Sequence, residues 1–209
     1  MIDFEQPIEL SGSEVALRPL ERSDIEAIGV AATGLRESHP VSFVPDGPDG
    51  ARRYVEAALS AKADGHRYPF AIIWRGVVSG TTSYLDFVEW ERPEGPRGAP
   101  AVVEIGATWL SHAAQRTRCN TEAKFLMLAH AFEHWRVARV SFKTDERNVH
   151  SRAAIERIGA QFEGIRRAEM LGADGAIRNS AYYSILADEW AAIRERLSAT
   201  LARDIPHHN

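Results

Sequence analysis

Two glutamates are the residues of this chain best suited to move a proton in a buried place. Glu104 lies in an apolar, β-branched run from Val102 to Leu110, which predicts a buried strand, and Glu169 lies in a second predicted strand, Gln161 to Leu171. Desolvation in a cleft raises the pKa of a carboxyl group, which suits it to accept a proton from an ammonium directly or through water. Either glutamate could be that base. The alternative for Glu104 is a structural role, as the partner of an arginine or as a cap of backbone groups.

The loop after the first of these strands has the composition of an anion site. It leads into the most hydrophobic predicted helix, whose apolar residues recur at helical spacing: Phe125, Leu128, Ala129, Phe132 and Trp135. Asn120 or Thr121 can cap this helix, so that unpaired N–H groups of its first turn face outward. These amides, the helix dipole and the cations Arg116, Arg118 and Lys124 would together attract an anion. The alternative is an ordinary connection with a solvated basic loop.

Two other residue patterns suggest chemistry more weakly. His130 and His134 are one helical turn apart, as zinc ligands often are, but no glutamate follows the first histidine as in the zinc-protease helix. We therefore expect helix-surface histidines and no metal site. Cys119 could be read as an acyl-accepting nucleophile, but no paired histidine and aspartate pattern accompanies it, so we do not assign it that role.

Composition limits the class of protein. The 209 residues, of which 44% are hydrophobic and 26% charged, predict one soluble domain over residues 1–209. A net charge of −4 gives no reason to expect a nucleic acid or a membrane surface as partner, and no apolar run approaches the length of a membrane span. One cysteine cannot form an internal disulfide, which agrees with a cytoplasmic location.

Periodicity elsewhere predicts the elements that must position these residues. Strands are predicted at residues 14–20, 68–74, 77–87 and 138–143, and a final hairpin at 161–171 and 178–186. Helices are predicted near residues 23–30, 50–63, 151–158 and 188–202. Prolines and glycines predict loops at 33–50 and 91–100.

Two runs of the chain, Gln115 to Lys124 and Lys143 to Ala160, resemble the GNAT superfamily of acyl-CoA-dependent N-acyltransferases. The chain is most similar to the branch that acetylates the N-termini of ribosomal proteins, over about residues 15–183. The resemblance implies an α+β fold with a mixed, mostly antiparallel twisted sheet, split around an acyl-CoA cleft and flanked by helices. It places the core at about 15–186 and a C-terminal helix at about 188–202. The family's loop pattern, Gln/Arg-x-x-Gly-x-Gly/Ala, is broken here, because Arg118 and Asn120 stand at the glycine positions.

The same resemblance implies a site for acetyl-CoA, or another acyl-CoA. The pantetheine would pair with the backbone of a strand segment, and the phosphates would lie on the loop. The cofactor-binding residues implied are Thr108, Trp109, Leu110, Gln115, Arg116, Thr117, Arg118, Cys119, Asn120, Thr121, Asn148 and Arg152.

Catalytic residues are implied at three positions. Many members carry a tyrosine acid where this chain has Ile155, whereas the ribosomal-protein branch resembles this chain in Asn148-Val149-His150-Ser151. Ser151 could return a proton to the thiolate, and Asn148 could both cap a helix and hydrogen-bond the pantetheine. Glu169 stands where that branch carries an active-site glutamate, so Glu104, Glu169 and water all remain candidate bases.

The function implied is acetylation of a primary amine, and we expect an α-amine of a protein N-terminus. An α-amine has a pKa of about 7.7–8.0 against about 10.4 for lysine, so a weak base suffices. The alternatives are a small-molecule amine, such as an antibiotic, a polyamine or an amino-acid-like compound, and a non-catalytic acyl-CoA sensor. A homodimer is possible. Family helices over the acceptor site would let Glu37, Ser38, His39 and Phe43 help choose the substrate, although an ordinary connecting loop is equally consistent.

Overall fold

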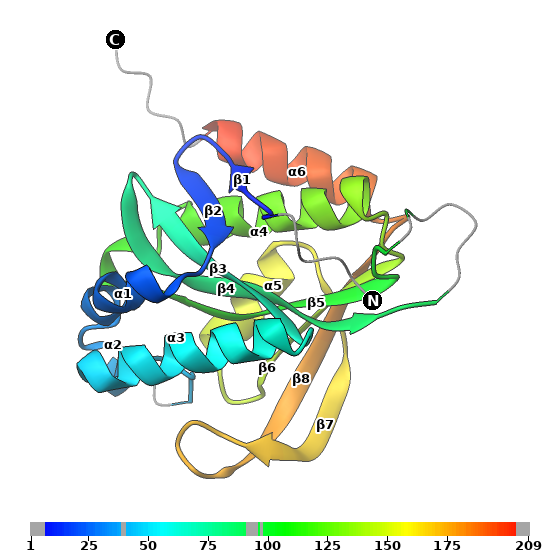
Figure 1. The fold of residues 1–209 in the computed structure, drawn as a ribbon. Coiled ribbons are helices and arrows are strands. Elements are labelled where there is room, and N and C mark those ends of the chain that lie inside the picture. Colours follow the sequence, from blue (N-terminus) through cyan, green and yellow to red (C-terminus); the bar gives the residue numbers. More distant parts are fainter. Residues whose placement is uncertain (1–6, 39–40, 91–95, 97, 204–209) are drawn as a thin grey trace.

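A single eight-stranded sheet organises the protein (Figure 1). The computed structural model describes residues 7–38, 41–90, 96 and 98–203. The strand order is β1-β2-β3-β4-β5-β6-β8-β7, and every pair is antiparallel except β5 with β6. The predicted mixed, mostly antiparallel α+β fold is therefore confirmed. The strands are β1 Leu10–Ser11, β2 Val15–Pro19, β3 Arg67–Trp74, β4 Val77–Val88, β5 Val102–Leu110, β6 Arg139–Asp145, β7 Gln161–Leu171 and β8 Ile177–Leu186.

Helices cover both faces of the sheet (Figure 1). One core, which includes Met127, Phe142 and Tyr183, lies under the helices α4 and α6. A second core, which includes Val55 and Trp109, lies under α1 and α3 on the opposite face. The helices are α1 Ile25–Ala31, α2 Leu35–Ser38, α3 Gly47–Ala63, α4 Cys119–Ala129, α5 Val149–Arg157 and α6 Trp190–Arg203. In the described part of the chain, no helix has the length and apolar composition that a membrane crossing requires.

The sheet splits between its two parallel strands. Register pairs join Val102 to Arg139, Val103 to Val140 and Glu104 to Ser141, and the later residues of β5 and β6 have no described register pair with each other. At Ala107 the backbone of β5 has a φ of 48°, and the register between β4 and β5 shifts there. This bulge gives β5 one extra residue and redirects the side chains that follow. The split predicted from the family resemblance is confirmed.

The boundaries of α4 differ from the prediction. The helix begins at Cys119 with Arg118 as its N-cap, so the expected caps Asn120 and Thr121 lie inside the first turn, and that prediction is wrong. The physical reason is Thr117, whose hydroxyl accepts a hydrogen bond from the Cys119 N–H at 3.1 Å and lets the helix start earlier. Residues 33–50, predicted as a loop, contain α2 and the first turn of α3.

Candidate functional site

A charged cleft lies where the sheet begins to split. Its volume is about 610 Å³, and it is lined by strands β4 to β8. Glu104 is the residue of β5 at the last β5–β6 register pair, and its carboxylate faces the cleft. It points away from α4, because Val103 and Ile105 on either side of it belong to the core under that helix. Glu169 lines the same cleft as Glu104.

Glu104 is paired with a lysine. Its Oε2 lies 3.2 Å from Lys143 Nζ, which also lies 3.1 Å from Asp86 Oδ2. Burial raises the pKa of Glu104 to about 7, the charge of Lys143 opposes this rise, and Asp86 adds to it. Burial also opposes the charge of Lys143, but the two carboxylates outweigh it and raise the pKa of Lys143. Near neutral pH, Glu104 is therefore a carboxylate that can gain or lose a proton.

Glu169 has a different environment in the same cleft. It accepts a hydrogen bond from the Tyr182 hydroxyl and lies 3.1 Å from the guanidinium of Arg166. Burial would raise the pKa of Glu169, but hydrogen bonds from Ser180 and Tyr182 lower it below its usual value. The pKa of Tyr182 is raised to about 12, by burial first and then by Glu169. Of the two candidate bases, Glu104 therefore has a raised pKa and Glu169 a lowered one.

The loop predicted to bind an anion, Gln115 to Lys124, has two of its three cations buried. The Arg118 guanidinium lies 3.6 Å from Glu122 and 3.9 Å from Glu14, and only 9% of its side chain is exposed. It is thus paired inside the protein, under the β1–β2 turn. The Lys124 side chain is also buried, so these two cations do not face outward as their position in the loop suggested. The phosphate contact predicted for Arg118 stays a prediction. Arg116 is exposed and is the cation of this loop that faces solvent.

The glycines missing from the loop are not required by its backbone. Arg118 has a φ of −69°, and Asn120 lies in the first turn of α4. Both conformations are ordinary for residues with a side chain. Arg116, with a φ of 59°, is the left-handed residue of the loop. The Gln115 side chain donates to the Leu110 carbonyl at 2.9 Å and ties the loop to the end of β5.

Cys119 is enclosed in the core beneath this loop. None of its side chain is exposed, and burial raises the pKa of its thiol to about 12, with Glu122 and Glu14 adding to the rise. A thiol of this kind is not a nucleophile near neutral pH, so Cys119 is not suited to accept an acyl group.

The segment that holds Ser151 begins α5. Asn148 caps the helix, accepting a hydrogen bond from the Ser151 N–H at 3.0 Å, and its amide nitrogen lies 3.3 Å from the Ser42 hydroxyl. The predicted capping role of Asn148 is confirmed. Arg152 donates to the Tyr183 hydroxyl at 2.8 Å and lies over the Phe162 ring. Ser151 is not part of the lining of the charged cleft, so its role as an acid stays a prediction.

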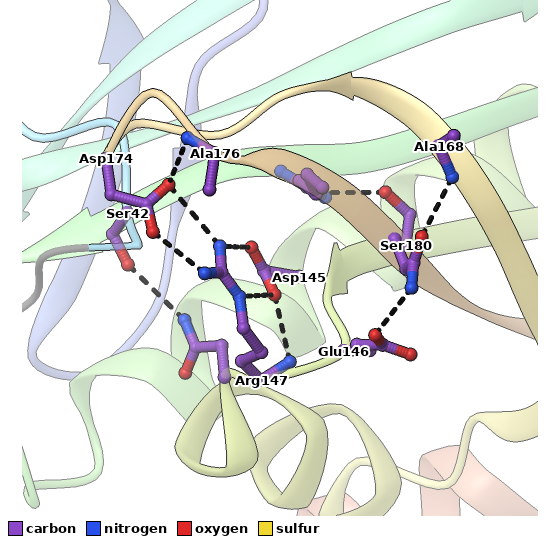
Figure 2. A network of polar contacts seen from close by, with 11 residues as sticks. Ser42, Asp145, Glu146, Arg147, Ala168, Asp174, Ala176 and Ser180 are labelled. Carbon is purple, nitrogen blue, oxygen red and sulfur yellow. Dashed lines mark hydrogen bonds and ion pairs between the residues drawn. The ribbon is translucent and has the colours of Figure 1, made fainter.

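A polar network near this segment was missed by the sequence analysis (Figure 2). Arg147 lies 2.7 Å from Asp145 and 2.8 Å from Asp174, and it lowers the pKa of both carboxyl groups. Arg36 donates to the Ala173 carbonyl in the β7–β8 turn. The network joins the start of α5, the β7–β8 turn and the segment after α2. Nothing in the spacing of these residues indicated it, because the contacts join parts of the chain that are far apart in sequence.

Two further expectations concern surface residues. His130 stacks on His134 at 5.2 Å but also packs against Tyr84 and Trp135, and burial lowers its pKa to about 4. It is therefore part of an aromatic cluster and not a surface histidine. The described residues contain no cluster of metal ligands. Among the predicted acceptor-side residues, Phe43 is half exposed, whereas the Glu37 and Ser38 side chains and all of His39 lie outside the described residues.

A known protein family matches most of this chain. The model of the family described as "Acetyltransferase (GNAT) domain" matches residues 14–161. The chain belongs to this family. GNAT acetyltransferases use an acyl-CoA and an amine acceptor, and the chain is accordingly an acyl-CoA acyltransferase. Among proteins of curated function, none matches the chain significantly.

Solved GNAT structures share the whole fold. A GCN5-related N-acetyltransferase from Brucella melitensis is 26% identical, with a TM-score of 0.79 over 93% of this chain and 85% of that one. A protein of T. thermophilus assigned as an acetyltransferase is 34% identical, with a TM-score of 0.77 over 94% and 98% of the two chains. Mycobacterium smegmatis RimJ, solved with CoA-disulfide, has a TM-score of 0.73 over 93% of each chain at 20% identity, which shows the fold alone.

Proposed function

We propose that this GNAT protein transfers the acetyl group of acetyl-CoA to a free α-amine, at a protein N-terminus, with Glu104 as the general base. The observation that carries the proposal is the position of Glu104, a buried carboxylate with a pKa of about 7 at the point where β5 leaves β6. A general base works best when its pKa lies near the working pH. Glu104 meets this condition and Glu169 does not.

The acceptor class follows from matching proton affinities. An α-ammonium, with a pKa of about 7.7–8.0, lies within about one unit of the Glu104 carboxylate, whereas a lysine ammonium at about 10.4 lies more than three units above it. Proton transfer to Glu104 is therefore nearly balanced for the first amine and strongly uphill for the second. The ion pair with Lys143 keeps part of the Glu104 population ionised near neutral pH.

The donor site is proposed along the free part of β5. Thr108, Trp109 and Leu110 lie beyond the last register pair with β6, so this strand edge can pair with an extended ligand. The exposed Arg116 lies in the loop after it and would face the phosphates. Acetyl-CoA supplies an activated acyl group and a thiolate leaving group. Glu104 takes one proton from the ammonium, and the neutral amine nitrogen then bonds to the acyl carbon as the carbon–sulfur bond breaks. The second proton that the nitrogen loses passes through Ser151 or water to the thiolate, which leaves the amide and the free thiol of CoA.

A small-molecule amine is the second candidate acceptor. A cleft of about 610 Å³ falls within the size range of small-molecule sites. Its lining of paired charges could recognise a compact polar amine as well as the first residue of a peptide. The reaction and the base would be the same, so only the acceptor differs between the two proposals.

Competition between acceptors tests the function. One peptide has a free N-terminus and a blocked lysine, the matched peptide has a blocked N-terminus and a free lysine, and a panel of small amines completes the set, with products detected by mass. We expect faster acetylation of the first peptide. Faster acetylation of the second would overturn the α-amine proposal, and exclusive acetylation of one small amine would establish the second candidate.

A further inference from the structure

Lys124 is a buried cation without a carboxylate partner in the described part of the chain. Its side chain points from α4 to the underside of the sheet, and only 6% of the residue is exposed. The ammonium donates to the Thr108 hydroxyl at 2.6 Å and to the Thr82 hydroxyl at 3.1 Å. Burying a charge is costly unless it is paired, and two hydroxyl groups offset this cost only in part. A group held at such a cost is a candidate for function.

The hydrogen bonds of Lys124 lead to the bulge of β5. The Thr108 hydroxyl lies 3.2 Å from the Gly106 carbonyl and donates to it. Lys124 and Thr108 therefore form a chain that spans Ala107, the bulged residue with a φ of 48°. A left-handed residue with a side chain is strained and persists where its surroundings hold it in place. The buried lysine holds this turn of the strand from below.

The bulge lies next to the segment that faces the proposed donor. Before Ala107, β5 is paired with β6 as far as Glu104, and after it Thr108 to Leu110 form the free edge. The charged group that acts on Lys124 is Glu104 of β5, and the groups in contact with it from β4 and β5 are hydroxyls. Thr82 in turn contacts the Met127 sulfur of α4 at 3.5 Å. Glu104 faces the cleft and Lys124 lies on the opposite face of the sheet, under the bulge.

We propose that Lys124 is a positioning residue for acyl transfer: through Thr108 it fixes the bulge of β5 and places a positive charge beneath the strand edge that receives the acyl group. The inference rests on the proposed function, because it assigns the acyl group to that edge. Negative charge develops on the acyl oxygen during the transfer, and a fixed charge nearby stabilises it without reorganisation. Lys124 touches no substrate and acts through the strand.

A matched set of variants tests this role by its effect on turnover. Lys124→Met keeps the volume and removes the charge, and Thr108→Val removes the link to the bulge. Tyr84→Phe is the control, because it removes a buried hydroxyl that donates to the Met127 carbonyl of α4 and is not part of the chain from Lys124 to Gly106. We expect Lys124→Met and Thr108→Val each to lower kcat about tenfold, less than the ~10²-fold or greater loss for a direct oxyanion donor, with little change in KM for acetyl-CoA. The double variant should lose no more than either single variant. Wild-type kcat in Lys124→Met, or an equal loss in Tyr84→Phe, would overturn the proposal.

Stability gives a second readout that does not need activity. Burial lowers the pKa of Lys124 to about 7, so part of the population carries the charge at pH 7, where kcat is compared, and this part shrinks at higher pH. Between that value and the unfolded value of about 10.4, the unfolded chain binds a proton that the folded protein does not, so wild-type stability rises with pH. Lys124→Met should therefore melt at a higher temperature than the wild type at pH 7, with the gap narrowing toward pH 10. A gap that does not depend on pH would contradict the buried charge. If the wild type acetylates no amine at all, the proposed function fails while this measurement still decides the charge state.

Discussion

Two buried carboxylates at opposite sides of the sheet have nearly the same exposure and very different surroundings. Glu122, on α4, accepts hydrogen bonds from the Ser13 N–H, the Ser13 hydroxyl and the Glu14 N–H in the β1–β2 turn. Its Oε1 leaves no room for a side chain at Gly12. Glu104, in the cleft, has Lys143 as its partner and Asp86 as its neighbour. One oxygen of Glu122 is held by three donors of one turn and the other lies 3.6 Å from Arg118, whereas Glu104 has one cation beside it and keeps capacity for a further proton or ligand.

The difference shows that burial alone does not distinguish a catalytic carboxylate from a structural one. Each hydrogen bond to a carboxylate favours its charged form and fixes its geometry. Three donors from one turn make Glu122 an anchor between α4 and the first hairpin. A single cation, offset by a second carboxylate, leaves Glu104 able to titrate near neutral pH. The count of fixed donors separates the structural carboxylate from the reactive one.

Replacing Glu104 is the most direct way to break this comparison. Glu104→Gln should lower kcat/KM by about 10² to 10⁴, because the base is lost while the shape of the cleft is kept. The folded protein binds the proton of Glu104 more tightly than the unfolded chain does, so wild-type stability falls as pH rises through about 7. The variant should therefore melt at or above the wild-type temperature at pH 8. Activity close to wild type would transfer the role to Glu169 or to water, with Glu169→Gln as the next test.

Replacing Glu122 should lower stability and leave the reaction rate unchanged. Glu122→Gln removes the nearer of the two carboxylates that pair with the buried Arg118, and we expect a loss of about 3 kcal/mol in the free energy of unfolding. At a temperature where the variant is folded, kcat should stay near the wild-type value. Denaturant unfolding and initial rates on the same preparation measure both. A variant that is stable but inactive would mean that Glu122 belongs to the reaction and not to the scaffold.

Replacing Lys143 or Asp86 should shift the pKa of Glu104 in opposite directions. Lys143→Met removes a positive charge and should raise the pKa of Glu104, moving the acidic limb of kcat/KM to higher pH by about one unit. Asp86→Asn removes a negative charge and should move the same limb to lower pH. The wild-type limb should lie near pH 7, with activity rising as pH rises through it. Limbs that stay in place in both variants would show that another group sets the profile.

The smallest effect concerns the donor loop. Arg116→Ala should raise the dissociation constant for CoA about threefold to tenfold, since an exposed charge–phosphate contact contributes modestly and weakens with salt. Arg118→Ala should mainly lower stability, because its guanidinium is already paired with Glu14 and Glu122. Calorimetry with CoA at two salt concentrations separates the variants. A larger affinity loss in Arg118→Ala would restore the phosphate role that the sequence first indicated for it.

The sequence predicted the elements well and the cations of the loop poorly, for a physical reason. Strand β5 and the cap of α5 at Asn148 depend on local periodicity and local hydrogen bonds, which a sequence displays directly. The directions of Arg118 and Lys124 depend on Glu14, Thr82 and Thr108, which the fold brings from other strands. The preference for Glu104 over Glu169 likewise needed Lys143 and Tyr182 in place. Contacts between side chains that are distant in the sequence leave no pattern in the spacing of residues.

The network around Arg147 also has a mechanical consequence (Figure 2). It fastens the tip of the β7–β8 hairpin and the start of α5 to the segment after α2, across the open end of the split sheet. Its Arg147–Asp174 arm is partly exposed, so dissolved ions weaken it more than they weaken the packed cores. We therefore expect ionic strength to set how far the two halves of the sheet can spread at this end. The rate at which bulky molecules pass this end should then depend on salt even when they carry no charge.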